Sequence, residues 1–318
     1  MTSEIASVIA FDLGGTNNKM WFDNREALLP SEKSLADADE DTILESLKHW
    51  IGNKEQIRVV GIALPCTMLP EKGDRKILST STKFASLAGG KHQGVVGEME
   101  KSWERELKRK VSILNDGEAA SIDVFAHLQN HYPDKNYKNV MVVTLGTSIG
   151  VGFVFNGNPY VGPYPSRSSH IILDPMGDWC VKENHRGCWK TLAGDKARRD
   201  LALNMGFEDQ ENKTLGMDSK PIADKARSGS KKAQLYFKIY AERVARGIAT
   251  IISAVPVECV VIAGGVAKAG QVLIDPLKER LERGDLLDPD LAPLIDVIQV
   301  DSFSVAHGAQ IYAFHQHG

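Results

Sequence analysis

A carboxylate, two glycines and a threonine follow the first apolar run of the chain, in a pattern suited to holding phosphate. The segment 8–10 predicts a buried strand, and Asp12, Gly14, Gly15 and Thr16 come directly after it. Glycines let backbone N–H groups approach an anion closely, and the threonine hydroxyl adds a donor. Beside a phosphate, the Asp12 carboxylate would hold Mg²⁺ directly or through water. The pattern predicts a phosphate-binding hairpin, although a plain hairpin could carry the same turn residues.

Two further glycine turns follow apolar runs that predict buried strands. They are Gly146, Thr147 and Ser148 after residues 140–144, and Gly264 and Gly265 after residues 260–263. Because the carboxyl ends of parallel strands meet at one edge of a sheet, the three turns predict a ligand as long as a nucleotide at such an edge. None of the turns has the spacing of a P-loop or of a dinucleotide-binding loop.

Asn115 and Asp116 lie between a short predicted strand, 111–114, and a predicted helix, 118–128. Taken alone, Asp116 could be the N-cap of that helix. Between phosphate-binding turns, the same carboxylate can accept the proton of a hydroxyl that attacks a γ-phosphate. Asp116 is therefore the candidate general base of a phosphoryl transfer.

The predicted elements around these residues indicate a duplicated α/β fold. Strand, turn and strand occur at residues 8–22 and again at 140–155, and apolar strands and amphipathic helices follow each copy. We predict an N-terminal lobe of residues 1–116 with 305–318, and a C-terminal lobe of residues 117–304.

The composition is that of a globular enzyme. The 318 residues are 42% hydrophobic and 25% charged, and the net charge of −3 offers no field for nucleic acid or an anionic membrane. No apolar stretch reaches the ~18 residues of a membrane span, and the N-terminus lacks a signal-peptide pattern, so a cytoplasmic protein is expected. The four cysteines are too few for a disulfide framework.

Six short segments carry a family resemblance over nearly the whole chain. They are Asp12-Leu-Gly-Gly-Thr16, Gly61-Ile-Ala-Leu-Pro65, Asn115-Asp-Gly-Glu-Ala-Ala120, Thr144-Leu-Gly-Thr-Ser-Ile-Gly150, the run Val260 to Gly270, and His307-Gly-Ala-Gln310. With these segments the chain resembles the sugar kinases of the ROK family, within the actin/hexokinase/Hsp70 superfamily. The resemblance implies two ribonuclease-H-like lobes, each a mixed sheet flanked by helices, with a nucleotide cleft between them.

The resemblance also implies roles for individual residues and partners. Asp116 would be the general base, with Asn115 and Pro65 beside a hexose or hexose derivative, while Asp12 and the glycine turns would surround the phosphates of ATP and Mg²⁺. The C-terminal helix would pack on the first lobe, and a homodimer would be usual. A repressor of this family would carry a helix-turn-helix ahead of the first strand, where only seven residues precede Val8, so no nucleic-acid partner is expected.

Two positions depart from the family pattern by charge. The family motif Glu-x-Gly-His is replaced by Arg167-Ser-Ser-His170, and Gly-Cys-x-Glu is replaced by Gly187-Cys-Trp-Lys190. A carboxylate accepts hydrogen bonds from hydroxyls, whereas Arg and Lys only donate and prefer carboxylate or phosphate. The exchange predicts an unusual, acidic sugar as substrate. The competing interpretation is that Arg167 points to solvent or that Lys190 caps its helix.

The zinc signature of the family is altered as well. The resemblance aligns His170, Cys180 and Cys188 with family ligands, and His185 lies where it could replace a missing cysteine. These four residues would form a structural Cys₂His₂ zinc site without an open coordination position. Because His and Cys are common in loops, a loop without metal is the alternative.

Two other functions remain open. The segment Thr144 to Gly150 also resembles polyphosphate glucokinases, so polyphosphate could replace ATP as donor. The missing hydroxyl-binding glutamates would also suit a protein that senses a sugar or nucleotide without turnover.

Overall fold

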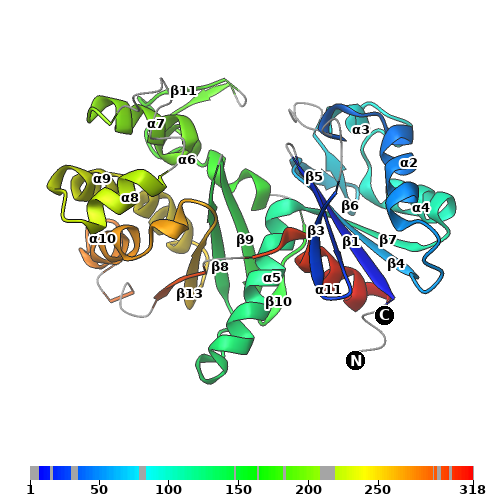
Figure 1. Cartoon of the computed structure of the whole chain (residues 1–318). Coiled ribbons are helices and arrows are strands. Elements are labelled where there is room, and N and C mark those ends of the chain that lie inside the picture. The colour runs from blue at the N-terminus through cyan, green and yellow to red at the C-terminus, as the bar shows by residue number, and fades with distance from the viewer. Residues whose placement is uncertain are drawn as a thin grey trace. The chain divides into compact units, whose positions relative to one another are not determined.

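The computed structural model describes residues 7–14, 17–29, 35–78, 84–146, 148–162, 165–181, 184–207, 219–288, 290–291, 295–300 and 303–317. The chain divides into two compact units. Unit 1 comprises residues 1–133, 159–166 and 304–318, and unit 2 comprises residues 134–158 and 167–303. Figure 1 shows the whole chain coloured from its N-terminus to its C-terminus.

Unit 1 is built on a five-stranded sheet with the order β3-β2-β1-β4-β7. Its strands are β1 (Val8–Leu13), β2 (Asn18–Phe22), β3 (Arg25–Leu29), β4 (Val59–Leu64) and β7 (Lys110–Asn115). The first three strands form an antiparallel meander, and β1, β4 and β7 are parallel. Every residue of β4 is buried, as expected of a central strand covered on both faces.

Unit 2 repeats this arrangement with the sheet order β10-β9-β8-β13-β14. The strands are β8 (Val140–Leu145), β9 (Ile149–Phe155), β10 (Asn158–Pro159), β13 (Cys259–Ala263) and β14 (Asp296–Gln299). Strand β8 pairs antiparallel with β9 and parallel with β13, which pairs parallel with β14. Each unit is therefore a meander followed by two parallel strands, which is the duplication that the repeated turns predict.

Helices and short turns complete both units. Unit 1 contains α2 (Glu40–Ile51), α3 (Ala85–Ala88), α4 (Val96–Leu107), α5 (Asp116–His131), α11 (Val305–His317) and the 3-10 turn η1 (Leu35–Asp37). Unit 2 contains α6 (Trp189–Ala193), α7 (Asp195–Asn204), α8 (Lys220–Arg227), α9 (Lys231–Ile252), α10 (Gln271–Glu282) and the turn η4 (Ala267–Ala269). The turns η2 (Pro133–Lys135) and η3 (Pro165–His170) lie at the junctions of the two units. Within the described residues, no helix has both the length and the apolar character needed to cross a membrane.

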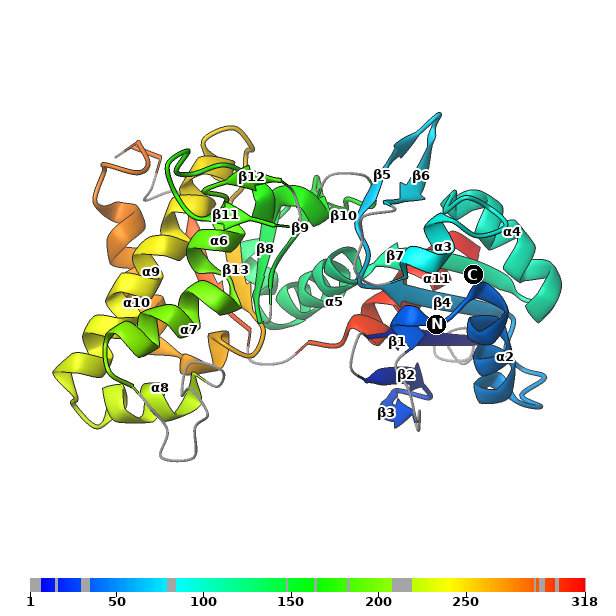
Figure 2. The same ribbon diagram turned by 90° about the horizontal axis from the view of Figure 1, so that it is seen from above.

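Two small hairpins stand apart from the main sheets. Strands β5 (Met68–Glu71) and β6 (Asp74–Ile77) form an antiparallel hairpin that extends away from the unit 1 sheet (Figure 2). Strands β11 (Trp179–Cys180) and β12 (His185–Arg186) form the second hairpin, in unit 2.

Helix α11, drawn in red in Figure 1, packs on the sheet of unit 1 although it follows unit 2 in sequence. Its Gln310 amide donates to the Val8 carbonyl at 2.9 Å. Glycines allow the close approach, because a Cβ on Gly61 would lie 2.5 Å from the Ala309 carbonyl oxygen and one on Gly308 would lie 1.8 Å from that of Ala119. Since Ala119 belongs to α5, this packing keeps α5 in unit 1, whereas the sequence-based boundary assigned residues 117–133 to the second lobe.

Candidate active site

Asp12 lies near the carboxyl end of β1, at the edge where the parallel strands of unit 1 end. It is in register with Ala63 of β4, which is in register with Leu114 of β7. With neighbouring strands about 4.8 Å apart, roughly 10 Å separates the Asp12 backbone from that of Leu114. Asn115 and Asp116 follow Leu114, so the two carboxylates predicted to act together belong to the same edge of one sheet.

The turn after β1 requires glycine at its first position. A Cβ on Gly14 would lie 2.3 Å from the carbonyl oxygen of Asn17, which is closer than any side chain tolerates. The backbone of this turn therefore folds back too tightly for another residue. Gly15 and Thr16 lie outside the described residues.

Asn115 is the N-cap of α5, and Asp116 is the first residue of that helix. The Asn115 side chain accepts from the Gly117 N–H at 2.8 Å and donates to the Cys66 carbonyl at 2.7 Å. The alternative that Asp116 is the cap is therefore wrong, because Asn115 occupies that position. The half-buried Asp116 carboxylate accepts from the Gly117 N–H at 2.9 Å, at the positive end of the helix dipole. Pro65 is half-buried between β4 and Cys66.

Glu118 fixes this corner of the sheet, and the sequence analysis did not single it out. Its carboxylate accepts from the backbone N–H groups of Asn115 and Gly162, each at 2.8 Å, and lies 3.5 Å from Nη1 of Arg75. Glu118 is 1% exposed, and burial raises its pKa against the opposing effect of Arg75. The sequence did carry a sign of this role, because an Asn followed three residues later by Glu resembles the capping box at the start of a helix.

Asn18, the first residue of β2, is a second group that the sequence analysis missed. Its side chain is 1% exposed, and neither its amide nitrogen nor its oxygen has a hydrogen-bond partner within the described ranges. Asn18 pairs with Leu13 across the turn that contains Gly14. Burying an amide without partners costs free energy, so this side chain is a candidate ligand contact beside the predicted phosphate hairpin.

The other two glycine turns lie together in unit 2. Gly146 follows β8 and donates its N–H to the Ser148 carbonyl at 3.0 Å. Gly264 follows the neighbouring parallel strand β13 with φ of 97°, and a Cβ there would lie 2.5 Å from the Leu145 carbonyl oxygen. Ser148 and Gly265 are exposed, and Thr147 lies outside the described residues. Adjacent strand ends thus bring the predicted turns of this unit together.

The four predicted zinc ligands form one cluster in unit 2. The ligand atoms of His170, Cys180, His185 and Cys188 all lie within 4.8 Å of one another. Nδ1 of His170 lies 3.7 Å from the Cys180 sulfur and 3.8 Å from the Cys188 sulfur. Tetrahedral Zn²⁺ bonded to sulfur and imidazole places such atoms about 3.6 Å apart.

The surroundings of the cluster also fit a metal. Nε2 of His185 is buried and has no hydrogen-bond partner among the residues that the structure describes. Both cysteines are buried as free thiols. The donor set of two thiols and two imidazoles is typical of structural zinc.

Arg167 and Lys190 lie close in sequence to two residues of this cluster. Arg167 lies on η3, three residues before His170, and Lys190 lies in the first turn of α6, two residues after Cys188. No side chain caps the N-terminus of α6, and the Lys190 ammonium pairs with no other residue in the described part of the chain. The interpretation of Lys190 as a helix cap is therefore not supported.

Comparison with known proteins places this architecture in an established class. A crystal structure of a ROK family glucokinase from Streptomyces griseus, in complex with glucose and AMPPNP, shares the fold with a TM-score of 0.68, at 18% identity, over 97% of this chain and 99% of that one. The predicted α/β fold of two lobes is confirmed.

A model of the ROK family matches residues 8–311, so the chain belongs to the ROK family, as the resemblance indicated. A glucokinase from Thermotoga maritima is 25% identical over 92% of this chain and 91% of its own length. A xylose repressor from Bacillus subtilis is 20% identical over 79% of this chain and 60% of the repressor.

Proposed function

We propose that this protein is a sugar kinase that transfers the γ-phosphoryl group of ATP to a hydroxyl of a hexose or hexose derivative. The observation that carries the proposal is the pair of carboxylates at one sheet edge, Asp12 near the carboxyl end of β1 and Asp116 at the start of α5. Phosphoryl transfer needs a group that accepts the hydroxyl proton and a site that neutralises the phosphates. The glucokinase from Thermotoga maritima and the AMPPNP complex of the Streptomyces enzyme support this assignment.

Asp116 accepts the proton of the sugar hydroxyl while the hydroxyl oxygen bonds to the γ-phosphorus. The bond from that phosphorus to the bridging oxygen breaks, and ADP leaves with the electron pair. In this proposal Asn115 and Pro65 would border the sugar. The turns at Gly14 and at residues 146–148 would surround the phosphates, and Gly264 would lie beside the nucleotide. A half-buried carboxylate such as Asp12 suits Mg²⁺, which when bound neutralises phosphate charge.

The cluster of His170, Cys180, His185 and Cys188 holds a structural zinc ion in this proposal. Four protein ligands leave no open position, so the site takes no part in chemistry. Its effect is to fix η3 and the start of α6, the two segments that carry Arg167 and Lys190.

The substrate that these two cations favour carries a negative charge. Lys190 has no protein partner within the described ranges, and its half-buried position limits competition from water. A carboxylate or phosphate on the sugar would bond to such donors more strongly than a neutral hydroxyl does. A hexose acid is therefore expected to be a better substrate than the neutral hexose.

Two other functions are tested by the same experiment. Polyphosphate as donor is motivated by the run Thr144 to Gly150, and a sensor without turnover is motivated by the xylose repressor among the relatives. Coupled ADP release would be measured with Mg-ATP, and sugar phosphate formation with polyphosphate, against neutral hexoses, N-acetylhexosamines, ketoses and sugar acids. Turnover with ATP supports the proposal, turnover with polyphosphate alone replaces the donor, and sugar binding without product in either assay supports a sensor.

A further inference from the structure

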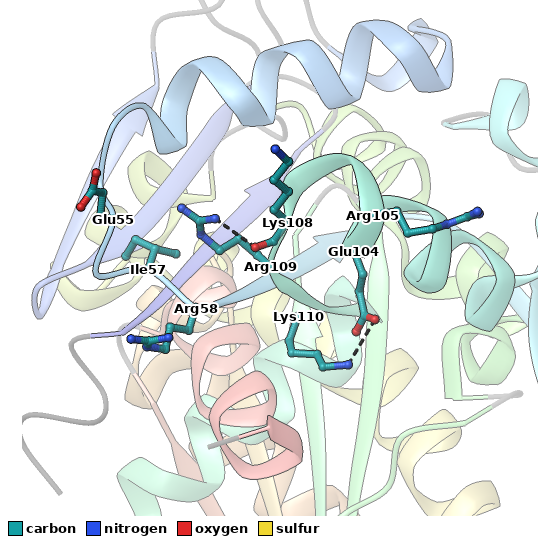
Figure 3. A pocket seen from close by; sticks show the side chains of 8 residues that line it. All are labelled: Glu55, Ile57, Arg58, Glu104, Arg105, Lys108, Arg109 and Lys110. Atoms are coloured by element: carbon teal, nitrogen blue, oxygen red, sulfur yellow. Dashed lines mark hydrogen bonds and ion pairs between the residues drawn. The ribbon is translucent and has the colours of Figure 1, made fainter.

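A pocket of about 500 Å³ lies in unit 1 at the opposite end of the parallel strands from Asp116. It is lined by residues that precede β4 and by residues around the end of α4 and the start of β7 (Figure 3). Strand β7 runs from Lys110 at this pocket to Asn115 at the catalytic edge. Five residues of strand span about 17 Å, so the pocket is separate from the proposed active site.

Positive charge dominates the lining. The lining contains two carboxylates, those of Glu55 and Glu104, and five cations, those of Arg58, Arg105, Lys108, Arg109 and Lys110. Two cations of this set already have protein partners. The Lys110 ammonium pairs with Glu104 of the same lining at 3.3 Å, and Arg105 donates to the Lys101 carbonyl. Figure 3 shows Arg105 pointing away from the other basic side chains.

The remaining three cations are available to a ligand. Arg58 and Lys108 have no side-chain hydrogen bond or ion pair with another residue in the described part of the chain. Arg109 donates from Nη1 to the Lys108 carbonyl at 3.0 Å, but its Nε is buried and has no partner among the described residues. A buried N–H without an acceptor is unfavourable, and an anion in the pocket would supply the acceptor.

The backbone adds a second indication. Lys108 caps the C-terminus of α4 with φ of 54°, a left-handed conformation in which glycine is favoured. The negative end of α4 can attract a cation in its last turn, but it does not provide a partner for Nε of Arg109. A glycine at position 108 would adopt this left-handed conformation without steric cost, but it would remove the Lys108 cation from the pocket.

We propose that this pocket binds a phosphorylated small molecule at a site separate from the catalytic edge. Two guanidinium groups and one ammonium group match the several oxygens of a phosphate group, and Ile57 offers an apolar surface to the rest of the molecule. The volume is that of a pocket for a metabolite. A net charge of −3 for the chain argues against a nucleic acid as ligand.

The test uses a fluorophore attached at the pocket. All four native cysteines are buried, so the variant Glu55→Cys can be labelled selectively without removing a cation. Glucose 6-phosphate should change the fluorescence with saturation, and glucose should not. Arg58→Gln and Arg109→Gln, both introduced into the labelled Glu55→Cys protein, should weaken the binding of glucose 6-phosphate about tenfold or more. The control Arg105→Gln in the same labelled protein should bind glucose 6-phosphate as before. Higher ionic strength should weaken binding as well.

Three results would overturn the proposal. One is an absence of any saturable response to the sugar phosphate, and another is equal affinity in the Arg58 and Arg109 variant. The third is a response to a glutamate-rich peptide without a response to glucose 6-phosphate, which would identify an acidic protein segment as the ligand. The label reports on this pocket alone. Asp116→Asn, introduced into the labelled protein, should therefore leave the fluorescence response to glucose 6-phosphate unchanged whether or not the protein is a kinase.

Discussion

The carboxylate of Glu118 accepts the backbone N–H of Asn115 at 2.8 Å, so a residue inside α5 holds the last residue of β7. The same carboxylate lies 3.5 Å from Arg75, whose guanidinium donates to the Ile113 carbonyl at 2.9 Å. Arg75 belongs to the β5–β6 hairpin, so three segments meet at the corner that presents Asp116. The position of Asp116, the base proposed for catalysis, therefore depends on the ion pair between Glu118 and Arg75.

Glu118→Gln should lower both the stability and the turnover of the enzyme. The Gln side chain places an NH₂ group where a carboxylate oxygen now accepts an N–H. It also removes one of the two carboxylates that pair with Arg75, so that Glu100 remains as the partner at 3.8 Å. We expect the free energy of unfolding to fall by about 3 kcal/mol. We also expect kcat to fall more than the KM for ATP rises, because the change displaces Asn115.

The control for Glu118→Gln is Glu98→Gln, an exposed glutamate in the first turn of α4. Urea unfolding and steady-state kinetics on both variants provide the measurement. Equal stability and equal kcat in the two variants would show that the Glu118 contacts do not position the base.

Asp116→Asn should reduce kcat by about 10²- to 10⁴-fold, because an amide cannot accept the hydroxyl proton. Nucleotide affinity, measured by calorimetry, should stay close to that of the wild type. The control Asp41→Asn changes an exposed carboxylate on α2 that pairs only at the surface with Lys91. A turnover for Asp116→Asn as high as for the control would remove Asp116 from the mechanism.

Cys188→Ser should lose zinc, because a hydroxyl is a poorer ligand than a thiolate. Elemental analysis of the wild type should give one zinc per chain. The variant should bind zinc more than about 100-fold more weakly, which exceeds the loss expected for a residue that only hydrogen-bonds to a metal ligand. Cys259→Ala removes a buried cysteine of β13 outside the cluster and should keep the metal. Wild-type protein without zinc after growth in zinc-supplemented medium would contradict the assignment.

Lys190→Glu should shift substrate preference from an acidic sugar toward the neutral one. Reversing the charge replaces attraction to a sugar carboxylate by repulsion, and we expect the ratio of kcat/KM values for acid and neutral hexose to fall about tenfold or more. Lys231→Glu alters an exposed lysine at the start of α9 and serves as control. An unchanged ratio in Lys190→Glu would place Lys190 outside the substrate site.

Gly308→Ala should destabilise unit 1 by about 3 kcal/mol, because the new methyl group cannot be accommodated 1.8 Å from the Ala119 carbonyl oxygen without moving α11 away from α5. Gly89→Ala is the matched control, since a Cβ there meets no atom within 4 Å. Urea unfolding compares the two. A Gly308 variant as stable as the Gly89 variant would mean that the helices separate at little cost.

Much of the sheet could be predicted because its signals are local. The apolar run Val59 to Leu64, bounded by Arg58 and Pro65, gives β4 with the bounds that the structure has. The clustering of His170, Cys180, His185 and Cys188 agrees with what the family resemblance implies for one short segment, with His185 in the place of a missing cysteine. Whether these residues bind zinc stays a prediction.

Other features depend on contacts between distant segments, which local patterns do not carry. The β5–β6 hairpin contains a proline and several charges, and its Arg75 contacts Ile113 and Glu118. That the Asn18 amide has no hydrogen-bond partner among the described residues is likewise visible only once its neighbours are placed. Glu118 could have been noticed as a capping box, but its bond to Gly162 spans a long stretch of chain.

The packing of α11 on β1 and β4 has a consequence for synthesis of the protein. Residues 305–317 are translated after every residue of unit 2, yet they cover the sheet that the earliest residues form. On the ribosome, the apolar face of β1 and β4 stays uncovered while unit 2 emerges and can fold. The nascent chain is therefore expected to expose that face to chaperones until α11 leaves the exit tunnel.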